Sequence, residues 1–242
     1  MPNHILEEAR LFLVNSLRGK SNEIESRHPW RRGWEFAVLH SLRVEAYTTR
    51  ILALDRSSLS EQETTLVRLA AILHDINRLE RREEHASLGA ETAKSWLMES
   101  SRYRLSDRDV ERVVEMIADH SNKSNPEPDY GKAVLKDADT LDEIGMMSIF
   151  MATNWVDMQS PFFFHNLRQR LVEVEIPYCE KKLEILNTGG AKQILQQRKA
   201  FLENFIDQIT DELQADALIE QMLQDFSKKN TEKVTEGEPQ DG

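Results

Sequence analysis

A histidine and an aspartate close an apolar stretch of the chain, where neither is expected without a partner. The stretch reads Leu69-Ala-Ala-Ile-Leu-His-Asp-Ile76, so His74 and Asp75 end a run with the composition of a buried helix. A buried imidazole and a buried carboxylate need compensation, and together they are good ligands for a divalent cation. The alternative is an ordinary helix end, with Asp75 bonded to nearby backbone and His74 satisfied within the core.

Further histidines and aspartates occur in similar settings. Beside apolar residues, in helical stripes or at expected helix ends, the sequence places His40, His85, His120, Asp137 and Asp139. Each has a simpler interpretation: a packed ring, a cation favoured by a helix C-terminus, or a solvated carboxylate. As a set spread over consecutive helices, they have the layout with which helical bundles build metal sites in their cores. The residues alone leave Asp137 and Asp139 as rival ligands.

Four local contexts, taken in order, resemble a known family. They are Leu39-His-Ser-Leu-Arg-Val44, Ala71-Ile-Leu-His-Asp-Ile76, His85-Ala-Ser-Leu-Gly-Ala90 and Asp137-Ala-Asp-Thr-Leu141. This ordered pattern is similar to that of the HD superfamily of metal-dependent phosphohydrolases. The resemblance covers about residues 30–150 strongly and extends more weakly to Leu186-Asn-Thr-Gly-Gly-Ala-Lys192.

The resemblance implies a set of metal ligands. A first divalent ion would be held by His40, His74, Asp75 and Asp139, with Asp139 preferred to Asp137 because of its place in the family pattern. Some members hold a second ion through histidines that correspond to His85 and His120, with the aspartate of the dyad, here Asp75, as the bridging and catalytic group.

The resemblance also implies a reaction, the hydrolysis of a phosphoester or phosphoanhydride in a nucleotide or a related small phosphorylated metabolite. A bound cation makes hydroxide available near neutral pH and offsets charge on the phosphoryl group. Imidazole and carboxylate ligands suit Mn, Mg, Fe, Co, Ni or Zn, and the single Cys179 rules out a multi-thiolate site. The alternative is a nucleotide-sensing or signalling HD module that binds its ligand without cleaving it.

Basic residues near the dyad are expected to meet the substrate. Many family members have Gly-Lys where this chain has Asn77-Arg78, and the guanidinium of Arg78 suits phosphate oxygens. We therefore expect Arg78 to act in catalysis and substrate binding, with Arg43 as a second substrate contact. Arg81 and Arg82 fit a solvated loop better. Trp30 and Trp34 could stack on a base or a sugar, or seal the end of the bundle. Asp142 or Glu143 could orient a ligand or serve as a base, and Asp142 could equally cap a helix or face solvent.

The composition limits the class of protein. The chain has 242 residues, 40% hydrophobic and 30% charged, with a formal net charge of −11. That charge argues against binding to large nucleic acids but not against a small anionic ligand. Neither a signal peptide nor an apolar run of the ~20 residues that a membrane span needs is found, so we expect a cytoplasmic protein without a membrane partner. A homo-oligomer is compatible with the sequence, which leaves the oligomeric state open.

Helical periodicity continues almost throughout, which predicts an all-α protein. We expect a single HD-type helical domain over 1–226 (core motif region 30–150) with additional C-terminal helices, and a polar, disordered tail over 227–242. Ser60 and Ser106 have the spacing of helix N-caps. Helices are expected over residues 3–18, 33–54, 61–74, 85–98, 107–120, 131–147, 162–175, 178–186 and 191–226.

Overall fold

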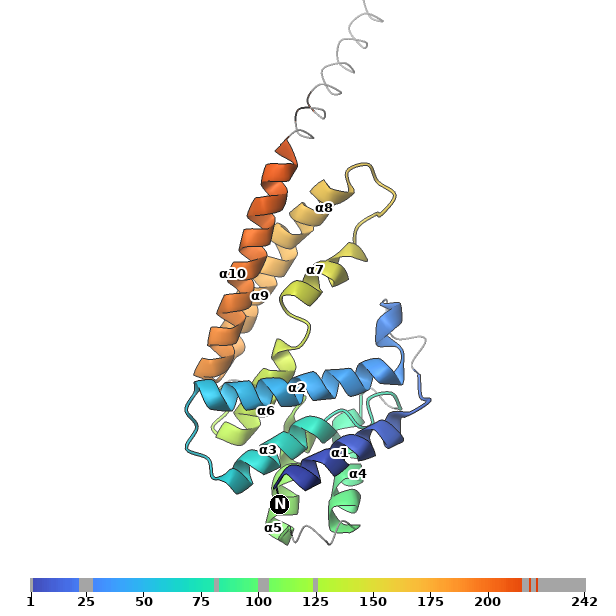
Figure 1. Ribbon diagram of the computed structural model, residues 1–242, viewed down its shortest axis with the longest axis vertical. Helices are drawn as coiled ribbons and strands as arrows, with labels where there is room; N and C mark the ends of the chain where they lie inside the picture. The colour runs from blue at the N-terminus through green and yellow to red at the C-terminus, as the bar shows by residue number, and fades with distance from the viewer. Residues whose placement is uncertain are drawn as a thin grey trace, which may run out of the picture.

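The computed structural model describes residues 2–21, 28–80, 83–99, 105–123 and 126–214, with Leu218 and Gln221. These residues form the all-α fold that the sequence predicts, and the only strand-like pairing among them is an isolated bridge between Ser21 and Gly33. Two parts are visible in Figure 1. A lobe contains helices α1 to α6, and an arm of helices α7 to α10 extends from it along the long axis.

The lobe begins with a helix that packs across its neighbours and then adds five more. Its helices are α1 (Pro2–Leu17), α2 (Trp34–Leu54), α3 (Glu61–Leu73), α4 (His85–Glu99), α5 (Asp107–Asp119) and α6 (Tyr130–Leu141). The caps follow the sequence: the Ser60 side chain accepts from the Glu63 N–H, and Ser106 forms a full capping box with Asp109. Both caps satisfy amide groups that the first turn leaves without a helical partner.

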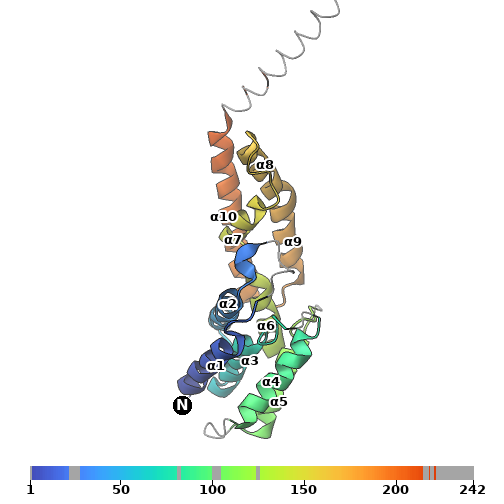
Figure 2. The ribbon, with the colours of Figure 1, turned by 90° about the vertical axis from the view of Figure 1, so that its right-hand side faces the viewer.

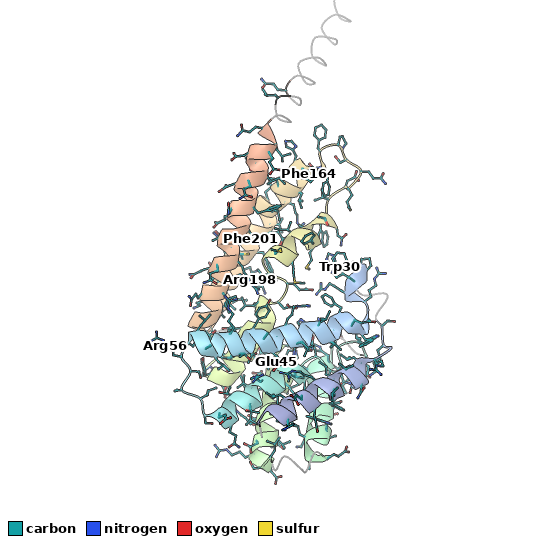
Figure 3. The ribbon with its side chains drawn as sticks, in the orientation of Figure 1. Trp30, Glu45, Arg56, Phe164, Arg198 and Phe201 are labelled. Carbon is teal, nitrogen blue, oxygen red and sulfur yellow. The ribbon has the colours of Figure 1, made fainter. Side chains whose placement is uncertain are left out.

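Helix α3 lies at the centre of the lobe. From Leu66 to Leu73 only Arg68 is not buried, so the helix is apolar on almost every side, as expected for one enclosed by neighbours. Arg68 pairs with Glu45 of α2, and Glu45 also accepts two hydrogen bonds from Arg10 of α1. Glu45, which lies between α2 and α3 in Figure 3, therefore links the three helices α1, α2 and α3.

The arm consists of four α-helices and one wide turn. They are α7 (Met146–Thr153), α8 (Phe163–Arg170), the π-helical segment η3 (Leu171–Glu175), α9 (Ile176–Ile185) and α10 (Gly189–Glu212). Figure 2 shows α9 and α10 running side by side, with their lower ends against the lobe. At that junction a Cβ on Gly190 would lie 2.9 Å from the Ile51 carbonyl, so the close approach of α10 to α2 requires a glycine there.

The helix expected over 131–147 is wrong at its C-terminal end. Helix α6 stops at Leu141, and Met147 belongs to the separate helix α7. Asp142 is extended, Glu143 has φ +63° and Gly145 has φ +110°, so the backbone leaves the helical region at once. The Arg198 guanidinium of α10 donates to the carbonyls of Leu141 and Ile144, so these two carbonyls have a hydrogen-bond partner although the helix is interrupted.

Two other expected boundaries differ. The segments expected as separate helices over 162–175 and 178–186 are continuous, because η3 leads directly into α9. The last helix is described to Glu212; the rest of the range expected to reach 226 lies largely, and the tail over 227–242 entirely, outside the described residues. Among the described helices, none combines the length and apolarity needed to cross a membrane.

Candidate metal centre

Four predicted ligands converge where α2, α3 and α6 meet. Nε2 of His40 lies 3.2 Å from Nε2 of His74, 3.4 Å from Oδ2 of Asp75 and 3.3 Å from Oδ1 of Asp139. Nε2 of His74 lies 3.8 Å and 3.7 Å from the same two oxygens. Ligand atoms that share a metal ion at bond lengths of about 2.1 Å must lie at about this separation from one another. We call this group cluster one.

The other oxygen of Asp75 faces a second group. Oδ1 of Asp75 lies 3.3 Å from Nε2 of His85 and 3.5 Å from Nε2 of His120, and these two nitrogens are 3.2 Å apart. We call Asp75, His85 and His120 cluster two. Because its two oxygens face different clusters, the Asp75 carboxylate has the placement expected of a bridging ligand.

The helix ends explain why the imidazoles point inward. His74 follows the last residue of α3, and its Nδ1 lies 2.9 Å from the carbonyl of Ala71; His120 holds the same position after α5, 2.7 Å from the carbonyl of Ile117. In both, Nδ1 donates to a carbonyl of the last turn of the helix. Nε2 is then the nitrogen with a free lone pair, and it faces the clusters.

Asp142 orients the third imidazole. Its Oδ2 lies 2.6 Å from Nδ1 of His40, and the carboxylate also accepts from Nε and Nη2 of Arg43 at 2.7 and 2.9 Å. Asp142 is therefore placed to orient the imidazole of His40. The same contacts engage two nitrogens of Arg43, so its predicted role as a substrate contact stays a prediction and its observed partner is Asp142.

Asp137 and Asp139 face opposite ways. Asp139 lies in cluster one, whereas Asp137 accepts hydrogen bonds from the backbone and side chains of Asn187 and Thr188 at the α9–α10 turn. Residues two apart on a helix are about 200° apart around its axis, so only one of the pair can face the clusters. The geometry favours Asp139 as the ligand.

Arg78 lies beside cluster two. Its Nη1 is 3.2 Å from Nε2 of His85 and 3.8 Å from Oδ1 of Asp75, and its side chain is 39% exposed. The predicted substrate contact is therefore within reach of both the clusters and solvent. Arg81 and Arg82 lie outside the described residues. Trp34 packs against the core, and Trp30 is exposed.

Two site residues were not anticipated from the sequence. Lys123 donates to Oδ2 of Asp139 and to the carbonyl of Lys136, and Oγ of Ser121 lies 3.1 Å from Nε2 of His85 and 3.2 Å from Nε2 of His120. Both follow His120 in the loop after α5. Their proximity to that histidine is the only sequence signal that could have drawn attention to them.

The donor set fits a divalent cation. Asp75 is buried, and within the described part of the chain its Oδ1 makes no hydrogen bond of acceptable geometry, although two imidazole nitrogens lie nearby. A buried carboxylate oxygen without a partner is costly, and a cation shared with those nitrogens would supply one. Two imidazoles with two carboxylates, and a second pair of imidazoles, match the borderline to hard ligands of Mn, Mg, Fe, Co, Ni or Zn.

A family model described as the HD domain matches residues 38–144, which span α2 to α6 and contain all the residues of both clusters. The protein contains an HD domain. Its motif histidines and aspartates are the ones that meet in clusters one and two. A search of curated proteins found no match.

Solved structures share the fold well beyond the HD domain. YpgQ of Bacillus subtilis is 16% identical, with a TM-score of 0.57 over 88% of this chain and 97% of that one. YpgQ in complex with ADP is similar at 18% identity, with the same TM-score and shares of each chain. A predicted HD superfamily hydrolase from an uncultured Thermotogales bacterium is 20% identical, with a TM-score of 0.56 over 86% of this chain and 92% of that one. At these identities the likeness establishes the fold, including the arm.

The charges around the HD motif predict a pH dependence of metal affinity. Burial alone would lower the pKa of His40, but hydrogen bonds with Asp139, Asp142 and Asp75 outweigh it and raise that pKa well above 6.5 in the metal-free protein. Below this raised pKa a proton occupies the nitrogen that a metal needs. We expect Mn²⁺ affinity to fall about tenfold per pH unit below it, with one proton released per ion bound.

Calorimetric titrations with Mn²⁺ at several pH values, each in two buffers of different ionisation enthalpy, measure both quantities. An affinity that stays constant between about pH 6 and 8, with no proton released, would contradict this assignment of the His40 proton.

Proposed function

We propose that this protein is a metal-dependent phosphohydrolase that cleaves a phosphoester or phosphoanhydride bond of a nucleotide or a related small phosphorylated metabolite. The observation that carries the proposal is the Asp75 carboxylate, which faces two imidazole clusters with one oxygen each. A protein that used the HD fold only as a scaffold would have no need to gather six imidazole and carboxylate groups around one point.

The residues divide into ligands and supports. Ions would be held by His40, His74, Asp75 and Asp139, with His85 and His120 for a second ion. A divalent ion bound there supplies Lewis acidity: it lowers the pKa of coordinated water and offsets phosphoryl charge. Asp142 lies at Nδ1 of His40, and the carbonyls of Ala71 and Ile117 lie at Nδ1 of His74 and His120. In these three imidazoles Nε2 is therefore the nitrogen left for a metal, which in His40 must first lose its proton.

Cations of the chain can receive the anionic substrate. Arg78 lies at cluster two with part of its guanidinium in solvent, and its fork of donors matches phosphate oxygens. In a protein with a formal net charge of −11, a basic group beside a cation site attracts an anion locally. That YpgQ, which shares the fold, has been solved in complex with ADP supports a nucleotide as the ligand.

The first test is turnover by the purified protein. We expect hydrolysis within a panel of nucleoside mono-, di- and triphosphates and model phosphoesters when Mn²⁺, Mg²⁺, Co²⁺ or Ni²⁺ is added. Removal of metal with a chelator should abolish it, and re-addition should restore it, because the ligands alone offer no means to activate water.

Protein that demonstrably carries metal but hydrolyses nothing in the panel would end the hydrolase proposal. A stable complex with an intact nucleotide in that same protein would favour the alternative, a sensing module that binds without cleavage.

A further inference from the structure

The turn between α9 and α10 attaches the arm to the HD domain close to the clusters. The turn between α9 and α10 is held by Asp137, which accepts from the amides of Asn187 and Thr188, and by Asn187, which accepts from the amide of Glu127. Glu127 lies in the loop after α5, the loop that also carries Lys123. These bonds place the C-terminal end of α9 beside α6 and that loop (Figure 2).

Lys182 lies in the last turn of α9, which ends at Ile185 just before this attachment. Its Nζ sits 5.2 Å from the centre of the Tyr178 ring. The side chain is half-buried, and the charges that act on its ammonium group are those of Lys123, Lys181 and Asp139. Burial and the two lysines lower the pKa of Lys182, against an opposing effect of Asp139.

Lys182 differs from the other cations near the clusters in having no anionic partner. Lys123 is bound to Asp139, and Arg43 is bound to Asp142. No carboxylate of the described residues lies within ion-pair distance of Lys182. A half-buried ammonium group among like charges, supported only by an aromatic ring, is electrostatically unfavourable until an anion binds.

We propose that Lys182 binds a phosphate group of the substrate, and that this phosphate is a different one from the group that meets the metal clusters. Lys182 is close enough to Asp139 to interact with its charge, yet it makes no ion pair with it, so a phosphate at Lys182 would adjoin the clusters rather than occupy them. The substrate is then a compound with linked phosphates, such as a nucleoside di- or triphosphate, that spans the HD domain and the arm. This inference rests on the proposed function and narrows its substrate class.

Binding of imidodiphosphate, a pyrophosphate analogue with a nitrogen in place of the bridging oxygen, tests the inference without turnover. The protein is loaded with Mn²⁺ and titrated calorimetrically as wild type and as the variants Lys182→Ala, Lys182→Arg and Lys181→Ala. Lys181 is the matched control, because it is the exposed neighbour on the same helix and its removal changes the net charge equally.

We expect Lys182→Ala to weaken imidodiphosphate binding about tenfold or more, and Lys182→Arg to retain affinity within about threefold, because the charge is kept. Lys181→Ala should stay within about twofold of wild type, and Mn²⁺ affinity should be the same in all four proteins. Removal of Lys182 should weaken the binding of inorganic phosphate, which has a single phosphate group, less than it weakens the binding of imidodiphosphate.

Unchanged binding in Lys182→Ala, equal losses in Lys182→Ala and Lys181→Ala, or no binding of imidodiphosphate by the wild type would overturn the inference. Failure of the proposed function gives a different result: wild type that binds imidodiphosphate through Lys182 but hydrolyses none of the panel refutes the hydrolase and leaves the phosphate site standing. Wild type that hydrolyses nucleotides with an unchanged KM in Lys182→Ala refutes only the phosphate site.

Discussion

The Asp75→Asn protein is expected to lose metal binding at both clusters and, with it, all measurable turnover. The substitution preserves the shape of the side chain but removes the charge that both clusters share through Oδ2 and Oδ1. In metal sites, loss of a residue that only supports a ligand already costs about 10–100-fold, so loss of the shared ligand should cost about 10³-fold or more in turnover. Metal content by mass spectrometry and turnover of the best substrate measure the two effects.

The control for this variant is Asp207→Asn, which makes the same charge change on an exposed position of α10, far along the arm. It should keep both its metal and its activity. Circular dichroism must show that Asp75→Asn still folds. If Asp75→Asn retains the metal content of the wild type, or turns over substrate within about tenfold of it, the assignment of Asp75 as the ligand shared by both clusters is wrong.

The free energy of unfolding of the Asp137→Ala protein is expected to be about 2–4 kcal/mol lower than that of the wild type, because removal of a buried hydrogen-bond acceptor leaves its donors unsatisfied. Asp137 is 2% exposed and accepts from the amides of Asn187 and Thr188, from Nδ2 of Asn187 and from Oγ1 of Thr188. Urea denaturation followed by circular dichroism measures the loss.

The variant also separates the two aspartates by function. Asp137 binds the turn between α9 and α10 and does not belong to either cluster. The Mn²⁺ affinity of Asp137→Ala should therefore stay within about threefold of the wild type, whereas Asp139→Ala should lose most of its Mn²⁺ affinity. The opposite pattern, with metal loss in Asp137→Ala and none in Asp139→Ala, would mean that Asp137 is the ligand. A stability change below about 0.5 kcal/mol would show that the turn does not depend on Asp137.

Much of this protein can be predicted from local sequence, because helices are local structures. The apolar period and the serine caps predict where most of the lobe's helices begin and end, since each hydrogen bond of a helix or cap joins residues three or four apart. The same locality places His74 and His120 at the ends of α3 and α5, where their Nδ1 atoms bond to the last turn. The order of these motifs is sufficient to indicate the HD family.

Tertiary structure alone decided the contacts between distant segments. The break after Leu141 is stabilised by Arg198, which is 57 residues away in the sequence. Its guanidinium donates hydrogen bonds to carbonyls that no longer accept from helical amides. Asp137 and Asp139 have the same local character, and only the position of Asn187, 50 residues later, assigns one to the arm and the other to the cluster. Lys182 carries no motif at all. Its proposed role depends on the packing of α9 against the lobe. The electrostatic field at a side chain is set by the charges that lie near it in space, and the order of residues in the sequence does not specify those neighbours.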